Sequence, residues 1–225
     1  MKKTIQLALL LGALLAVATY ALGASNSRIV RADNGVLKIV TSMDGTGTPY
    51  VDDSSSDSLI FGNLASKYPK GLYWCCDSLM VQGPGQGYEV WTAAAFTPSA
   101  NATVTKVTVA VGYETSTNTY DVLLSLNADN NGVPGRALKT WKVTFPGGKP
   151  VLGSCCVVKS KTGSIPVSAN TQYWVVLSTE ANSDIWAGWN LNDKDEIDHI
   201  LYAQYINGVW TTYSDSGPAF AVYGH

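Results

Sequence analysis

The chain has 225 residues, of which 46% are hydrophobic and 14% charged, and its formal net charge is −2 at pH 7. A soluble domain ordinarily carries about 25% charged residues, so uncharged polar side chains must form most of this surface. The high apolar fraction excludes a disordered, highly charged tail protein. The small number of basic residues excludes a nucleic-acid binder that relies on phosphate contacts.

Residues 1–24 have the pattern of a secretory signal peptide. Two lysines follow the initial Met, an apolar run extends from Ile5 to Leu22, and small residues come next. A basic start, an apolar middle and a small-residue end are typical of such peptides, and they predict cleavage after Gly23 or Ala24. The apolar run is also long enough to span a bilayer, so an uncleaved anchor is the alternative. We expect a secreted chain without membrane insertion, in the periplasm, at the cell surface or beyond it.

The four cysteines occur as two adjacent pairs, Cys75-Cys76 and Cys155-Cys156. Neighbouring Cα atoms lie about 3.8 Å apart, whereas disulfides usually join Cα atoms roughly 4.4–6.8 Å apart. Since export favours disulfides, we predict bridges between the two pairs. Neighbouring side chains of a strand point to opposite faces, so both bridges require a loop or bulge at one pair. A zinc site is the alternative, but adjacent cysteines lack the usual ligand spacing.

From residue 25 to residue 58 the chain is polar, apart from a strand-like run over Val36–Val40. It contains Gly45-Thr46-Gly47 and a run of Asp and Ser from Asp52 to Asp57. Such composition is typical of loops and linkers. We therefore interpret residues 25–58 as a polar N-terminal segment outside the core.

Beyond residue 58, apolar and polar residues alternate in short runs rich in Val, Thr, Tyr and Trp, which is the pattern of β-strands. The clearest runs are 104–113, 120–127, 141–145 and 173–177, with a last apolar pair at Phe220 and Val222. Outside the signal peptide, no stretch of a dozen residues has an apolar stripe at helical spacing. The pattern predicts an all-β fold, a single antiparallel and jelly-roll-like β-sandwich of about ten to twelve strands over residues 59–225.

Two segments predict specific turns. Asp129–Gly135 combines Asp, Asn, Gly and Pro between two alternating runs, as expected of a hairpin loop. Ile165-Pro166-Val167 leads through Asn170 into Tyr173. This resembles the corner of many β-sandwiches in which a buried Tyr hydroxyl bonds back to the chain.

Five segments carry a family resemblance. They are Ala93–Val104, Leu126–Gly135, Gln172–Leu177, Trp186–Asn190 and Ala219–Gly224. In their residues and in their order along the chain, these segments resemble the bacterial choice-of-anchor R domain, over residues 59–224. The resemblance implies an exported surface β-sandwich without catalytic activity, and it assigns no site residue.

Catalytic signatures are sparse. His199 and His225 are the two histidines, and the Gly-x-Ser-x-Gly turn of many serine hydrolases is missing. Glycoside cleavage needs two carboxyl groups, and the 17 acidic residues offer many pairs without marking any one of them. We therefore expect no enzyme and no organic cofactor.

Two segments carry oxygen ligands suited to calcium. They are Asp193, Asp195, Glu196 and Asp198 in one, and Asp129, Asn130 and Asn131 in the other. Neither follows the EF-hand pattern, so a charged loop and a turn are the competing interpretations.

Aromatic residues are dense near the C-terminus. Six of them form a candidate carbohydrate platform: Trp186, Trp189, Tyr202, Tyr205, Trp210 and Tyr213, with Phe220 and Tyr223 close behind. Trp and Tyr rings match the apolar face of a sugar, and Asn190, Asn192 and Gln204 add hydrogen-bonding groups. The alternative is that these rings fill the core of the sandwich. Asn101-Ala102-Thr103 reads as a glycosylation sequon or as a turn before a strand.

The leading hypothesis is a secreted, non-catalytic β-sandwich that binds an extracellular polysaccharide or surface proteins. A structural matrix or surface-layer protein is the first alternative, and a glycoside-active enzyme is the second. Nucleic acid is not an expected partner.

Overall fold

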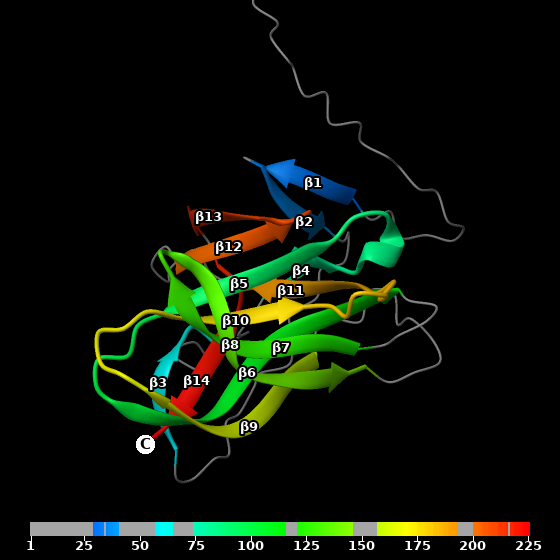
Figure 1. Cartoon of the computed structure of the whole chain (residues 1–225). Helices are drawn as coiled ribbons and strands as arrows, with labels where there is room; N and C mark the ends of the chain where they lie inside the picture. The colour runs from blue at the N-terminus through cyan, green and yellow to red at the C-terminus, as the bar shows by residue number, and fades with distance from the viewer. Residues whose placement is uncertain are drawn as a thin grey trace, which may run out of the picture.

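The computed structural model describes residues 29–33, 35–40, 57–64, 74–115, 121–145, 157–192, 200–215 and 217–225. These residues form fourteen strands and one short 3-10 turn, and they include no α-helix (Figure 1). The strands are β1 (Ile29–Asp33), β2 (Val36–Val40), β3 (Ser58–Gly62), β4 (Trp74–Gln82), β5 (Val90–Phe96), β6 (Ala102–Thr115), β7 (Asp121–Asn130), β8 (Val133–Thr144), β9 (Val157–Val167), β10 (Tyr173–Ser178), β11 (Trp186–Leu191), β12 (Ile200–Ile206), β13 (Val209–Asp215) and β14 (Phe220–Gly224), and the turn is η1 (Pro84–Gln86).

The strands pair in antiparallel fashion and form two layers. The first layer has the strand order β9-β6-β11-β4-β2-β1. Strand β11 pairs with only one end of β6, and β14 pairs with the remainder of the same edge of β6. Strand β3 pairs with the other edge of β14. The second layer runs β8-β7-β10-β5-β12-β13. The layers are joined where β4 meets β5 at the pair Gln82–Val90. This arrangement confirms the predicted all-β antiparallel sandwich.

The core lies between the two layers and follows the predicted period of two. Val107 and Val109 of β6 meet Leu124 of β7 and Val175 of β10, and all four side chains are fully buried. Burying apolar area at roughly 25 cal/mol per Å² is the main force that holds the layers together. The opposite face of the second layer, called the outer face below, carries the alternate residues of the same strands.

The N-terminal segment contributes more to the fold than its composition predicts. Strand β1 pairs with β2, and β2 pairs with β4. Val36 and Leu37 are buried. The Gln204 side chain of β12 accepts a hydrogen bond from the Leu37 amide at 2.8 Å and donates one to its carbonyl at 3.0 Å. The interpretation of this part of residues 25–58 as a linker outside the core was therefore wrong, because it pairs with β4 and is hydrogen-bonded by the buried Gln204 side chain.

The predicted turns are present. Asn131 and Gly132 connect β7 to β8 with φ angles of 54° and 85°, as in the tight hairpin turns that match strand twist. The Tyr173 hydroxyl accepts a hydrogen bond from the Ser168 amide at 2.9 Å, and the Tyr173 side chain is buried. Both turns hold the ends of strands that carry the site described next.

Residues 1–28 lie outside the described residues, so the signal peptide stays a prediction. No helix in the described part of the chain is long and apolar enough to cross a membrane.

Candidate functional site

The predicted platform residues do not lie on one surface. Trp189 is fully buried in the core, where its Nε1 donates to the Ala219 carbonyl at 2.8 Å and its ring meets Phe220 edge-on at 6.1 Å. A side chain enclosed in this way cannot contact a ligand. The prediction of Trp189 as a binding residue was therefore wrong, and the core interpretation holds for it.

Tyr202 and Tyr213 also serve the fold. Tyr202 is 1% exposed and its ring stacks on that of Tyr213 at 5.4 Å. The Tyr213 hydroxyl donates to the Gly35 carbonyl at 3.2 Å, and burial raises the pKa of Tyr213. These contacts attach the β12–β13 hairpin to the turn before β2. The two tyrosines are fold-stabilising side chains, which corrects their assignment to the platform.

Trp186 lies apart from the other candidates. It is partly buried against Leu37, Met80 and Val90, in a cluster at the join between the layers. Of the other candidate groups, Asn190 and Gln204 are buried, as are Phe220 and Tyr223, and the Asn192 amide donates to the Asn63 carbonyl. The prediction of one continuous platform in the C-terminal region is corrected accordingly.

Tyr205 and Trp210 do lie on the outer face, and they meet there a residue from far away in the sequence. Tyr205 of β12 pairs with Trp91 of β5 on one side and with Trp210 of β13 on the other. Residues paired directly across strands share a face, so the three rings cluster. The Trp91 ring stacks on Tyr205 at 4.4 Å and 16°, and it meets Trp210 at 6.4 Å and 57°.

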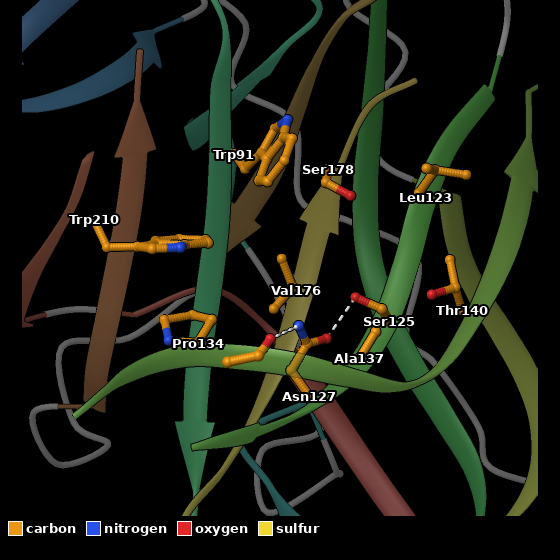
Figure 2. A pocket seen from close by; sticks show the side chains of 11 residues that line it. Trp91, Leu123, Ser125, Asn127, Pro134, Ala137, Thr140, Val176, Ser178 and Trp210 are labelled. Carbon is orange, nitrogen blue, oxygen red and sulfur yellow. Dashed lines mark hydrogen bonds between the residues drawn. The ribbon is translucent and has the colours of Figure 1, made fainter. Parts of the chain in front are cut away.

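These rings border a pocket of about 220 Å³ on the outer face (Figure 2). The pocket is lined by residues from five strands: Trp91, Leu123, Ser125, Asn127, Pro134, Gly135, Ala137, Thr140, Val176, Ser178 and Trp210. Val176 pairs with Ser125 on β7 and with Ala93 on β5, which places all three on the outer face, opposite Val175 in the core.

The curvature of the second layer forms this pocket. Its two edge strands, β8 and β13, contact each other across the outer face. The face between them carries small side chains at Ala93, Ala95 and Ala203, packed with Trp174. The small alanine side chains leave room for the Trp174 ring, which is fully buried on this face. Pro134 of β8 and Trp210 of β13 therefore lie on the same side of the pocket (Figure 2).

The floor is polar and its hydrogen bonds are fixed. The Ser125 hydroxyl donates to Asn127 Oδ1 at 2.7 Å, and Asn127 Nδ2 donates to the Gly135 carbonyl at 2.7 Å (Figure 2). Ser125 is 5% exposed and Asn127 is 9% exposed. These bonds leave Ser125 Oγ as an acceptor and the second Nδ2–H of Asn127 as a donor, side by side.

Asp129 holds the wall of the pocket against the sheet. Its Oδ1 accepts hydrogen bonds from Trp174 Nε1 and Gln172 Nε2, both at 2.7 Å, and its Oδ2 accepts one from the Gly132 amide at 3.0 Å. Desolvation raises the pKa of Asp129, but the three hydrogen bonds outweigh it and lower the pKa below its ordinary value of 3.8. Hydrogen bonds to the charged form favour that form, so the carboxylate is anionic at neutral pH.

The two calcium candidates have different outcomes. The carboxylate oxygens of Asp129 are already engaged by protein donors, which supports the turn interpretation of that segment. The acidic candidate, Asp193, Asp195, Glu196 and Asp198, lies outside the described residues and stays a prediction. No group of three or more His, Cys, Asp or Glu residues suited to a metal occurs in the part of the chain that the structure describes.

The four cysteines stay a prediction as disulfides. Cys75 and Cys76 belong to β4 by backbone, while Cys155 and Cys156 lie outside the described residues. The pairing of β11 with β4 passes from Asn190–Ser78 to Leu191–Trp74, so its register skips the residues between Trp74 and Ser78.

Comparison of the chain with protein-family models, with curated proteins and with solved structures found no match. The resemblance to the choice-of-anchor R domain therefore stays an expectation from the sequence.

Sequence reasoning found two residues near the pocket, Tyr205 and Trp210, and missed Trp91 and the polar floor. Trp91 stands in an almost continuous apolar run, Val90–Phe96, which gives no sign that one of its faces opens outward. The signal that identifies it is its pairing with Tyr205, more than a hundred residues away in the chain. Ser125 and Asn127 alternate with Leu124 and Leu126, so the period of two placed them outward without indicating a pocket.

Proposed function

We propose that the protein is a non-catalytic carbohydrate-binding β-sandwich and that the pocket on the outer face is its binding site. The observation that carries the proposal is the combination of two tryptophan rings, Trp91 and Trp210, with a buried polar floor at Ser125 and Asn127. A sugar has an apolar ring face and a rim of hydroxyl groups. Aromatic side chains pack against the first and hydrogen-bonding groups meet the second.

The state of Trp91 supports a binding role. Tyr205 covers one face of the indole, so the opposite face is the one available to a ligand. A ring held by such stacking loses little conformational entropy when a ligand packs against it, and preorganisation of this kind favours affinity.

The lining also favours binding over cleavage. The residues that line the pocket carry hydroxyl, amide and aromatic groups, and among these described residues none has a carboxyl group. Hydrolysis of a glycosidic bond ordinarily uses two carboxyl groups close to the bond. Secretion, which the N-terminal residues predict, places such a binder where it can reach extracellular polysaccharide.

The test is retardation of the protein in native gels that contain soluble polysaccharides, followed by calorimetry with the best binder. Trp91→Ala and Trp210→Ala should each weaken binding about tenfold or more, because each removes an aromatic face worth roughly 0.5–1.5 kcal/mol beyond its buried area. Trp91→Phe, which keeps a ring on Tyr205, should bind with intermediate affinity.

Trp186→Ala is the matched control, since Trp186 is partly buried but does not line the pocket. It should lower stability and leave binding unchanged. Equal binding by the wild type, Trp91→Ala and Trp210→Ala would contradict the assignment of the pocket.

A further inference from the structure

We infer that the pocket selects one neutral sugar unit of a soluble glycan chain, and that it discriminates against acidic sugars and against crystalline polysaccharide surfaces. This inference rests on the proposed function and specifies its ligand. Four observations support it: the angle between the rings, the volume of the pocket, the hydrogen-bonding groups of the floor, and the charges at one end.

The angle between the rings argues against a flat ligand. A crystalline polysaccharide presents its sugar rings in one plane, so the side chains that stack on it must also be coplanar. The rings of Trp91 and Trp210 are inclined by 57° at a centroid distance of 6.4 Å. The two rings form a corner. A sugar ring can pack against one of them while a second group of the ligand contacts the other.

The volume agrees with a small ligand unit. Pockets that enclose drug-sized molecules measure roughly 300–1,000 Å³. The present pocket has about 220 Å³, which accommodates one sugar ring and leaves the remainder of a chain in solvent.

The floor distinguishes a hydroxyl group from a carboxylate. Ser125 Oγ is available as an acceptor and Asn127 Nδ2 retains one donor, because their other hydrogen bonds are fixed within the protein. A hydroxyl both donates and accepts, so it satisfies the two groups together. A carboxylate only accepts, and it would place its charge against the Ser125 oxygen.

The charges near the pocket also argue against an acidic sugar. Leu123, at one end of the lining, pairs with Lys142 on β8. The Lys142 ammonium contacts Asp121 at 3.2 Å and Glu180 at 2.8 Å. Two carboxylates thus pair with the Lys142 ammonium, which makes this cation less able to attract a uronic acid.

The experiment compares three classes of probe by affinity gel electrophoresis and pull-down. They are neutral soluble chains (hydroxyethylcellulose, galactomannan and dextran), acidic soluble chains (alginate and polygalacturonate) and insoluble crystalline cellulose or chitin. At least one neutral chain should bind at least tenfold more tightly than either acidic chain at 150 mM salt, and Trp91→Ala should abolish this difference.

Floor variants give a second readout. Ser125→Ala and Asn127→Ala should each weaken binding of the neutral chain roughly three- to tenfold, as expected for loss of one hydrogen bond. Lys142→Ala should leave neutral binding within about twofold and weaken acidic binding further, because it exposes the two carboxylates.

The outcomes separate the two proposals. Absence of any Trp91-dependent binding to a saccharide would overturn the proposed function and this inference together. Binding that depends on Trp91 but is equal or tighter on alginate, polygalacturonate or crystalline cellulose would overturn the inference alone.

Discussion

Single buried polar side chains decide how the N-terminal strands join the sandwich. Gln204 is fully buried and bonds to both backbone groups of Leu37, with the Thr92 hydroxyl at 3.4 Å from its amide nitrogen. The side chain thus supplies the backbone of β2 with the donor and acceptor that a neighbouring strand would otherwise provide. A buried amide satisfied in this way links two elements that are 167 residues apart.

Replacement of Gln204 by Leu is expected to destabilise the protein by roughly 1–3 kcal/mol. Leucine has a similar size but leaves the amide and carbonyl of Leu37 without partners, and the cost of such unsatisfied groups has this magnitude. Urea unfolding followed by tryptophan fluorescence measures the change. Ser214→Ala, at an exposed position of β13, is the control and should shift stability by less than about 0.5 kcal/mol. Equal stability of Gln204→Leu and wild type would refute this role of Gln204.

Residue identity alone could not separate the core aromatics from those at the surface. Trp189 and Trp210 have the same chemistry and similar neighbours in the sequence, yet one is fully buried and the other borders a pocket. The difference arises from the strands: β11 lies inside the first layer, and β13 is at the edge of the second. Whether an aromatic ring is buried depends on where its strand lies in the layers, and composition does not reveal that position.

At the scale of elements, the β7–β8 hairpin is the part of the fold that builds the pocket wall. Pro134 and Gly135, at the start of β8, line the pocket, and Asp129 at the end of β7 holds this region against Trp174. Gly135 has no room for a side chain, since a Cβ there would lie 2.9 Å from the Asn130 Cβ. A glycine at this position therefore allows β7 and β8 to approach each other closely next to the turn.

The stability of this hairpin should depend on pH through Asp129. Because the pKa of Asp129 is lowered in the folded protein, its contribution is fully present above 3.8 and is lost as the pH falls through the lower folded value. Wild type should therefore exceed Asp129→Asn in stability by roughly 1–2 kcal/mol at pH 6, and this difference should shrink below about pH 4. Urea midpoints between pH 2.5 and 6 measure it.

Gln172→Ala serves as the graded control, since it removes one of the three donors to Asp129. Its destabilisation should be smaller and should decline over the same pH range. A difference between wild type and Asp129→Asn that is the same at pH 6 and pH 2.5 would rule out the carboxylate as its source.

Local sequence signals predicted the elements with regular alternation and missed those without it. The Asn131-Gly132 turn and the Tyr173 corner followed from residue preferences that act over a few positions. In contrast, β12 (Ile200–Ile206) is buried on both sides over much of its length, so its apolar residues show no period of two. Its burial depends on β5, which lies far earlier in the chain, as well as on the adjacent β13.

At the scale of the whole molecule, the predicted disulfides concern the first layer. The register of β4 against β11 skips the stretch that contains Cys75 and Cys76. Bridges between the two cysteine pairs stay a prediction from the sequence.

Non-reducing peptide mapping of protein purified from its native compartment checks the cross-links. The peptide with Cys75 and Cys76 should be joined to the peptide with Cys155 and Cys156. Reduction should lower stability by roughly 2–5 kcal/mol, in keeping with the loss of native disulfides that close long loops. Recovery of four free thiols would disprove the bridges.

The fold class could be read from the sequence because it depends on a pattern repeated in many strands. The pocket could not, because it depends on the pairing of particular strands. Val107, Val175 and Phe220 all belong to the core. Their apolar character predicts inward-facing positions whichever strands pair with theirs. Trp91, Asn127 and Trp210 form one site only because β5, β7 and β13 belong to the same curled layer, with β8 and β13 in contact.

Strand β14 has a consequence for how the protein reaches its folded state. It lies between β3 and β6, and the backbone groups of Thr103 and His225 bond to each other just beyond it. Synthesis delivers a polypeptide from its N-terminus onward, so β3 must wait for residues 220–224 before it gains its neighbour in the sheet. Completion of the first layer is thus a late event, and a nascent chain leaves part of β6 without this partner strand until β14 has been made.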